Sequence, residues 1–150
     1  MIDTIWIIDD DEIHQLITRR LLERFHEVGA IVALRRTKSA LEHLERVEQG
    51  ADALPDLVFA GLLPESRDED RQFLKRYGKL VGHYPHVPLF FLVTASTQRP
   101  VRRQSGWEDY ITGYLSKPFS PGRLSTVLLA AAQAEEDEGG HRTFPFLSRR

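Results

Sequence analysis

Short apolar runs alternate with stretches of helical periodicity along this chain, and that alternation constrains the possible folds more than any other feature. Five apolar runs are expected to form strands, at residues 4–8, 30–35, 56–60, 88–95 and 113–116. Strands that alternate with helices are typical of βαβ units, in which the strands run parallel. The sequence therefore predicts a doubly wound α/β fold, with a five-stranded parallel sheet and helices on both faces.

The segments between these runs carry apolar residues three or four positions apart, which predicts a core-facing stripe on each helix. The first stripe consists of Ile13, Leu16, Ile17, Leu21, Phe25 and Val28, and its helix is expected to end near Gly29. The next two stripes consist of Ala40, Leu41, Leu44 and Val47, and of Phe73, Leu74, Tyr77, Leu80 and Val81. A short helix is expected over 97–104, and the last stripe consists of Leu124, Val127, Leu128 and Ala131.

These elements fill residues 1–134, which are expected to form one domain, and residues 135–150 are expected to form a tail. The tail opens with an acidic run and Gly139–Gly140, a composition typical of a flexible segment. It then carries an apolar cluster at 144–147, with the sequence FPFL. Two interpretations stay open: a disordered terminus, or a segment that docks on this domain or on a partner.

Composition excludes several classes of function. A net charge of −2 offers no broad attraction to nucleic acid or to anionic membranes. The absence of cysteine excludes disulfides, thiolate metal sites and a cysteine nucleophile. The N-terminal sequence MIDTIWIIDDDE lacks a basic start and a long apolar run, so neither a signal peptide nor a membrane span is expected. We expect a cytoplasmic protein that binds neither nucleic acid nor membranes.

Polar residues follow the predicted strands at the edge where functional groups gather in open parallel sheets. They are Asp9, Asp10 and Asp11 after the first strand, Thr94 after the fourth and Lys117 after the fifth. Carboxylates hold Mg²⁺, while a hydroxyl and an ammonium group contact phosphate oxygens. Each residue alone has a simpler explanation, since the aspartates could cap the first helix. Together they indicate a site for a divalent cation and a phosphoryl group.

The same residues resemble those of the receiver domains of bacterial two-component response regulators. IWIIDDDE is similar to the family's first strand, with Asp9 and Asp10 as its acidic pair, and VTAS places Thr94 at its conserved hydroxyl. GYLSKPF places Tyr114 at the switch aromatic and Lys117 at the invariant lysine. The resemblance implies a flavodoxin-like fold and a cis peptide bond between Lys117 and Pro118.

The match fails at the phosphoacceptor. In PDLVFAG the family's acceptor aspartate is replaced by Gly61, which has no side-chain oxygen to phosphorylate. Asp56 lies five residues earlier, at the other end of the strand, and is not expected to substitute for it. Glu65 and Asp68 lie in a downstream loop, LLPESRDED, that also departs from the family pattern. We therefore expect a vestigial phosphorylation pocket without an acceptor.

The loss of one carboxylate changes the electrostatics of such a pocket. Two adjacent unit charges at 4 Å interact by about 4 kcal/mol at an effective dielectric constant of 20. Removing the third carboxylate weakens that repulsion and deletes a metal ligand, so poor Mg²⁺ binding and no cofactor are expected. Lys117 should then form a standing ion pair with Asp9 or Asp10.

Two functions remain open at this stage. The first is a stand-alone receiver module that binds proteins independently of phosphorylation and catalyses no reaction. The second is a phosphatase similar to the haloacid dehalogenases, with Asp9 as nucleophile and Asp11 as acid/base. Against the phosphatase, the first helix begins directly after the aspartates and leaves no room for a flap.

A partner surface is expected on the helix at 97–104, the strand at 113–116 and the last helix. Tyr114 would lie on it as the residue at the family's switch aromatic. Arg102 and Arg103, beside Trp107, are candidates for contacting an acidic partner there, because arginine and tryptophan are enriched at interfaces. The expected partner is a histidine kinase, a phosphotransfer protein or a second copy of the chain. His83 and His86 are interpreted as loop residues rather than metal ligands.

Overall fold

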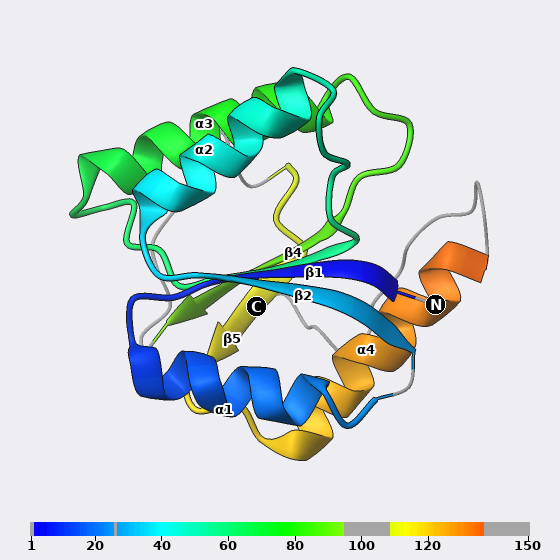
Figure 1. The fold of residues 1–150 in the computed structure, drawn as a ribbon. Helices are drawn as coiled ribbons and strands as arrows, with labels where there is room; N and C mark the ends of the chain where they lie inside the picture. Colours follow the sequence, from blue (N-terminus) through cyan, green and yellow to red (C-terminus); the bar gives the residue numbers. More distant parts are fainter. Residues whose placement is uncertain (1, 26, 95–108, 137–150) are drawn as a thin grey trace.

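A computed structural model describes residues 2–25, 27–94 and 109–136, in which five parallel strands form one sheet in the order β2-β1-β3-β4-β5 (Figure 1). The strands are β1 (Ile2–Ile8), β2 (Val28–Leu34), β3 (Leu57–Ala60), β4 (Leu89–Thr94) and β5 (Gly113–Ser116). The helices are α1 (Glu12–Leu22), α2 (Thr37–Glu48), α3 (Asp68–Val81) and α4 (Pro121–Glu136). The predicted doubly wound, flavodoxin-like fold is confirmed.

Two hydrophobic clusters lie on the two faces of the sheet. Figure 1 shows α2 and α3 on one face, and α1 and α4 on the other. Strand side chains alternate between the faces, so that Phe90 packs under α3 and Phe91 packs in the cluster with α4. No helix in the described ranges is long and apolar enough to cross a membrane.

The first helix and the second strand differ from the prediction. The helix ends at Leu22, and the chain turns at once, with the Phe25 amide donating to the Leu22 carbonyl at 3.1 Å. Val28 then begins β2 and pairs with Ile2, so it is a strand residue and not part of a helical stripe. Gly29 lies inside this strand, where a Cβ atom would meet the Asp3 carbonyl oxygen at 2.7 Å. The glycine permits this close approach of two strands and does not end a helix.

The predicted core-facing stripe of α1 is wrong, because three of its members point to solvent. Ile13 is 71% exposed, Leu16 is 52% exposed and Ile17 is 43% exposed. The inner face of the helix instead consists of His14, Gln15, Thr18 and Leu22, all buried. The Gln15 side-chain amide donates to the Leu34 carbonyl at 2.9 Å, and His14 binds Asp9. Polar contacts to the end of the sheet therefore determine which face of α1 is turned inward.

The other stripes agree with the prediction. In α3 all five predicted residues are buried, and in α4 the four predicted residues are buried. In α2 three of them are buried and Leu41 is partly buried. The last helix extends to Glu136, two residues past the predicted domain boundary at 134. The helix expected over 97–104 lies outside the described residues.

Candidate functional site

The ends of β1, β3, β4 and β5 bring the predicted site residues to one edge of the sheet. Asp9 follows β1 and Gly61 follows β3, whose last residues Ile8 and Ala60 pair with each other. Thr94 ends β4, and its carbonyl accepts the Lys117 amide at 2.9 Å. The peptide bond between Lys117 and Pro118 is cis. The topology thus brings Asp9, Gly61, Thr94 and Lys117 to the same end of the sheet.

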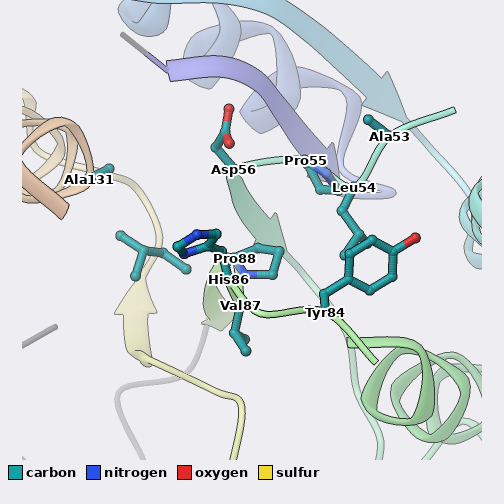
Figure 2. A pocket seen from close by; sticks show the side chains of 10 residues that line it. Ala53, Leu54, Pro55, Asp56, Tyr84, His86, Val87, Pro88 and Ala131 are labelled. Atoms are coloured by element: carbon teal, nitrogen blue, oxygen red, sulfur yellow. The ribbon is translucent and has the colours of Figure 1, made fainter. Parts of the chain in front are cut away.

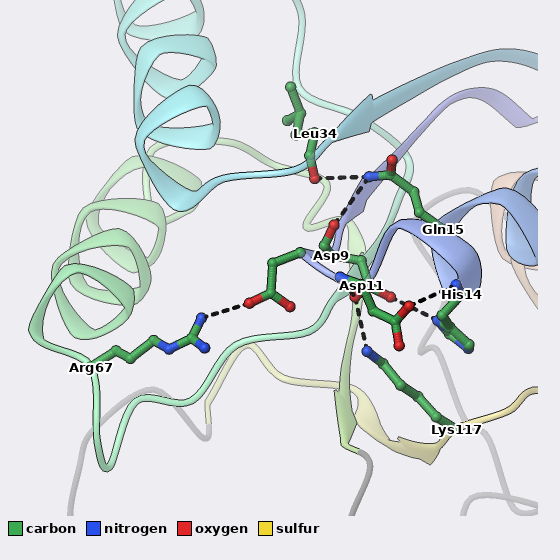
Figure 3. Close-up of polar contacts among 8 residues, drawn as sticks. Asp9, Asp11, His14, Gln15, Leu34, Arg67 and Lys117 are labelled. Carbon is green, nitrogen blue, oxygen red and sulfur yellow. Dashed lines mark hydrogen bonds and ion pairs between the residues drawn. The ribbon is translucent and has the colours of Figure 1, made fainter.

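Asp9 is the centre of this site, and both of its carboxylate oxygens have partners (Figure 3). Lys117 Nζ donates to Oδ1 at 2.8 Å, and His14 Nδ1 lies 2.7 Å from Oδ2. The Asp11 amide also donates to Oδ1, at 3.0 Å. Asp9 is 3% exposed, so its charge is balanced by groups inside the protein rather than by water. The predicted ion pair with Lys117 is present.

The pKa of Asp9 results from opposing effects. Burial raises it, whereas the hydrogen bonds from His14, Lys117 and the Asp11 amide and the charge of Lys117 lower it. The lowering effects prevail, and the pKa lies below its usual value of 3.8. Asp9 is therefore a carboxylate, bound in a standing polar network, at neutral pH.

The two following aspartates have other roles. Asp10 is exposed and pairs with Arg67 at 3.1 Å. Asp11 is the N-cap of α1, and its Oδ1 accepts the His14 amide at 3.1 Å. Of the three carboxylates, only Asp9 points into the buried site.

Gly61 has room for a side chain. A Cβ atom there would lie 3.4 Å from the Ile8 carbonyl oxygen and 3.5 Å from Asp9 Oδ1, which are ordinary contacts. Neither steric crowding nor a positive φ angle therefore requires a glycine after β3. What is missing at this position is the functional group.

The loop after Gly61 is fixed by a residue that sequence reasoning missed. Asp70 is 1% exposed, accepts the Leu63 amide at 2.8 Å and accepts the Thr37 hydroxyl. The Leu63 carbonyl accepts the amides of Ser66 and Arg67, at 3.1 and 2.8 Å. Because the Asp70 carboxylate is buried and both of its oxygens have donors, it holds the loop in one conformation.

His14 is the second residue that the sequence analysis missed. It stands five positions after Asp9, in the first turn of α1, and its ring packs against Phe119 with the centroids 4.9 Å apart. No metal-ligand spacing marked it, and it lies between two apolar residues of the misassigned stripe. Its position one helical turn after the N-cap was the available signal.

The magnesium ion that the family resemblance implies does not fit this donor set. Asp9 binds Lys117 and His14, Asp10 binds Arg67, and Gly61 supplies no ligand. The Leu63 carbonyl, a further candidate ligand, already accepts two amides. Across the described parts of the chain, no three His, Asp or Glu side chains are grouped to hold a metal ion.

Asp56 lies at the other edge of the sheet, as expected. Its Oδ2 accepts the amides of Asp3 and Thr4, at 2.7 and 3.1 Å, so it fixes the start of β1. A surface cavity of about 250 Å³ opens beside it, lined by Tyr84, His86, Val87 and others (Figure 2). His86 thus lies at this edge rather than in the site around Asp9.

The predicted partner surface is described only in part. Tyr114 lies on β5 and is 37% exposed. Arg102, Arg103 and Trp107 lie outside the described residues, so their place on this surface stays a prediction.

No protein-family model matches the sequence. One curated relative, the probable methanogenesis regulatory protein FilR2 of Methanothrix harundinacea (strain 6Ac), is 30% identical over 118 residues. The match covers 77% of this chain and 72% of that protein.

Solved structures of response regulators have the same fold. A two-component response regulator from Cytophaga hutchinsonii superposes with a TM-score of 0.67 at 18% identity, covering 88% of this chain and 98% of that one. A chain from the complex of the phosphorylated P1 domain of CheA3 with CheY6 of R. sphaeroides gives a TM-score of 0.56 at 17% identity, covering 88% and 98%.

The fold is that of a signalling receiver module. The chain belongs to the receiver family of two-component response regulators.

Proposed function

We propose that this chain is a receiver module that binds its signalling partner without being phosphorylated. The observation that carries the proposal is the state of Asp9, whose oxygens bind Lys117 and His14 beside an acceptor position occupied by Gly61. Lys117 is therefore held by a permanent carboxylate, and the surface that depends on it has one state. The module includes the whole of α4, up to Glu136, and is not an enzyme.

The proposed partner is a histidine kinase or a phosphotransfer protein. The structural relative crystallised with a phosphorylated P1 domain supports partners of this kind for the fold. Tyr114, beside Arg102, Arg103 and Trp107, would form the contact surface, and a homodimer through the same surface is the alternative assembly. Because this surface is fixed, Tyr114 should keep one rotamer in different crystal forms.

The phosphatase alternative receives no support from the geometry. Asp11, its expected acid/base, caps α1, and Glu12 begins the helix directly after it. Incubation with para-nitrophenyl phosphate and Mg²⁺ tests this alternative. Turnover that disappears in Asp9→Asn would show that the chain is an enzyme.

The main test is phosphorylation by acetyl phosphate in the presence of Mg²⁺, followed by mass spectrometry. We expect no phosphoryl adduct on the wild-type chain and no heat of Mg²⁺ binding by calorimetry. An adduct on any aspartate of the wild-type protein would overturn the proposal.

Two variants show how far the pocket has diverged. Gly61→Asp supplies the acceptor at a position with room for its Cβ atom, but Asp10 stays paired with Arg67, so we expect weak Mg²⁺ binding and little adduct. Adding Arg67→Ala releases Asp10 to act as a metal ligand, and the double variant should gain more adduct. Arg76→Ala, which removes a partly exposed arginine of α3 from its pairs with Glu45 and Glu48, is the matched control and should have no effect.

A further inference from the structure

Among the helices of the described residues, α1 has the most exposed large apolar side chains on its outer face. Charged residues of opposite sign lie at its two ends. Ile13, Leu16 and Ile17 lie on the outer face at helical spacing, and all are more than two-fifths exposed. Acidic residues lie at the start of the helix, at Asp10, Asp11 and Glu12, and basic residues at its end, at Arg19 and Arg20. Along the helix axis this face is therefore acidic, then apolar, then basic.

The end of α4 and the segment that follows it have the same order of acidic, apolar and basic residues from the N- to the C-terminal side. Residues 135–138 are Glu-Glu-Asp-Glu, residues 144–147 are Phe-Pro-Phe-Leu, and residues 149–150 are both arginine. If this segment ran antiparallel to α1, its acidic part would meet the basic end of the helix. Its apolar part would then meet Ile13, Leu16 and Ile17, and its arginines would meet the acidic start.

The position of α4 permits this path. Helices α1 and α4 lie on the same face of the sheet, and each follows a parallel strand, so both end at the same edge (Figure 1). The distance from Glu136 to the level of Ile17 is about 18 Å. This value combines the displacement along the helix axis, at a rise of 1.5 Å per residue, with a separation of about 10 Å between the axes of the two helices. The eight steps from residue 136 to 144 span up to about 26 Å when extended. The linker is thus long enough.

Among the described residues, Glu12 at the start of α1 and Arg19 at its end are held only by exposed ion pairs. The pairs Glu12–Arg35 and Arg19–Glu23 are solvent-exposed, with separations of 3.3 and 3.4 Å. Exposed pairs of this kind contribute little to stability and exchange partners readily.

We propose that residues 144–147 bind to the outer face of α1, antiparallel to the helix, and cover Ile13, Leu16 and Ile17. A partner that uses this face must then displace the segment, which makes residues 137–150 a built-in competitor for α1. The inference does not depend on the phosphorylation state of the module.

The absence of cysteine allows a direct test by paramagnetic NMR. A nitroxide label on Ser148→Cys should broaden the amide signals of residues 12–18 and leave those of α3, on the other face of the sheet, sharp. Broadening confined to other residues, or none at all, would contradict the proposal. A sample that mixes labelled, NMR-silent protein with unlabelled ¹⁵N protein separates the second-copy alternative. Broadening of α1 in that mixture would mean that another molecule supplies the segment, and the proposal would be wrong.

Paired substitutions sharpen this test. Leu16→Asp should abolish the broadening, since it places a charge in the contact, while Leu129→Asp on the outer face of α4 should leave it in place. Because both leucines are exposed, neither change should unfold the protein. Phe146→Ser, made in the segment itself, should also abolish the broadening. Persistence of the broadening in Leu16→Asp and in Phe146→Ser would overturn the proposed contact.

Discussion

Helices α1 and α3, which lie on opposite faces of the sheet, are built by different rules. Helix α3 turns its apolar stripe inward, and Phe73, Leu74 and Tyr77 are fully buried. Helix α1 turns His14, Gln15 and Thr18 inward and leaves Ile13, Leu16 and Ile17 exposed to solvent.

The difference arises at the carboxyl edge of the sheet. Asp9 is buried there and requires donors, because an unpaired buried carboxylate is costly. His14 supplies one of them only if that face of α1 turns inward, and Gln15 on the same face donates to the Leu34 carbonyl. A polar network at a site can therefore outweigh the burial of several aliphatic side chains in fixing the rotation of a helix.

The largest test of this comparison substitutes one leucine in each layer. Leu74→Ala removes a fully buried side chain of α3 and should lower the free energy of unfolding by about 2–5 kcal/mol. Leu16→Ala should change it by about 1 kcal/mol or less, because Leu16 is already more than half exposed. Urea denaturation measures both. Equal losses would show that α1 buries its apolar stripe after all.

Removing the charge of Asp9 should have the next largest effect. Asp9→Asn leaves Lys117 and His14 without their carboxylate, and we expect the free energy of unfolding to fall by about 1–3 kcal/mol at pH 7. This is less than the usual cost of breaking a buried ion pair, because Lys117 can turn toward solvent. Since the pKa of Asp9 is lower in the folded state, its contribution is fully present above about pH 4 and is lost as the pH falls through the folded pKa.

The pH dependence provides the control for that experiment. The stability difference between wild type and Asp9→Asn should shrink as the pH falls below 3.8, the ordinary pKa of an aspartate. Asp52→Asn, which removes an exposed partner of Arg46, should differ much less from the wild type in its free energy of unfolding at pH 7. A constant difference for Asp9→Asn between pH 7 and pH 3 would contradict the assignment of a stabilising charge to Asp9.

Sequence reasoning was most successful where the residues have only one role. The apolar stripes of α3 and α4 and the run of β4 are buried in the core and nothing else, so their periodicity predicts them correctly. The positions of Asp9 and Lys117 followed from the topology, because parallel strands deliver their ends to one edge.

It was least successful where a side chain makes a specific long-range contact. The sequence places His14 one turn after the N-cap but does not fix its pairing with Asp9, and it does not pair Asp70 with Leu63 and Thr37, because these contacts depend on helix rotation and loop conformation. Val28 was assigned to a helix because helical spacing happened to continue past Leu22 into an edge strand. Periodicity alone could not detect the tight turn between them.

The smallest predicted effect probes the inner face of α1 directly. Thr18 is fully buried, and among the described residues its hydroxyl has no hydrogen-bond partner. Thr18→Val replaces that hydroxyl by a methyl group at nearly the same helix propensity and should raise the free energy of unfolding by about 1 kcal/mol. Gln15→Met, one turn earlier on the same face, should lower it by about 1 kcal/mol, because it loses hydrogen bonds to the Leu34 and Asp9 carbonyls. Opposite signs in urea denaturation would show that the polar inner face is stabilised by particular hydrogen bonds, whereas a loss in both variants would mean that Thr18 also has a partner.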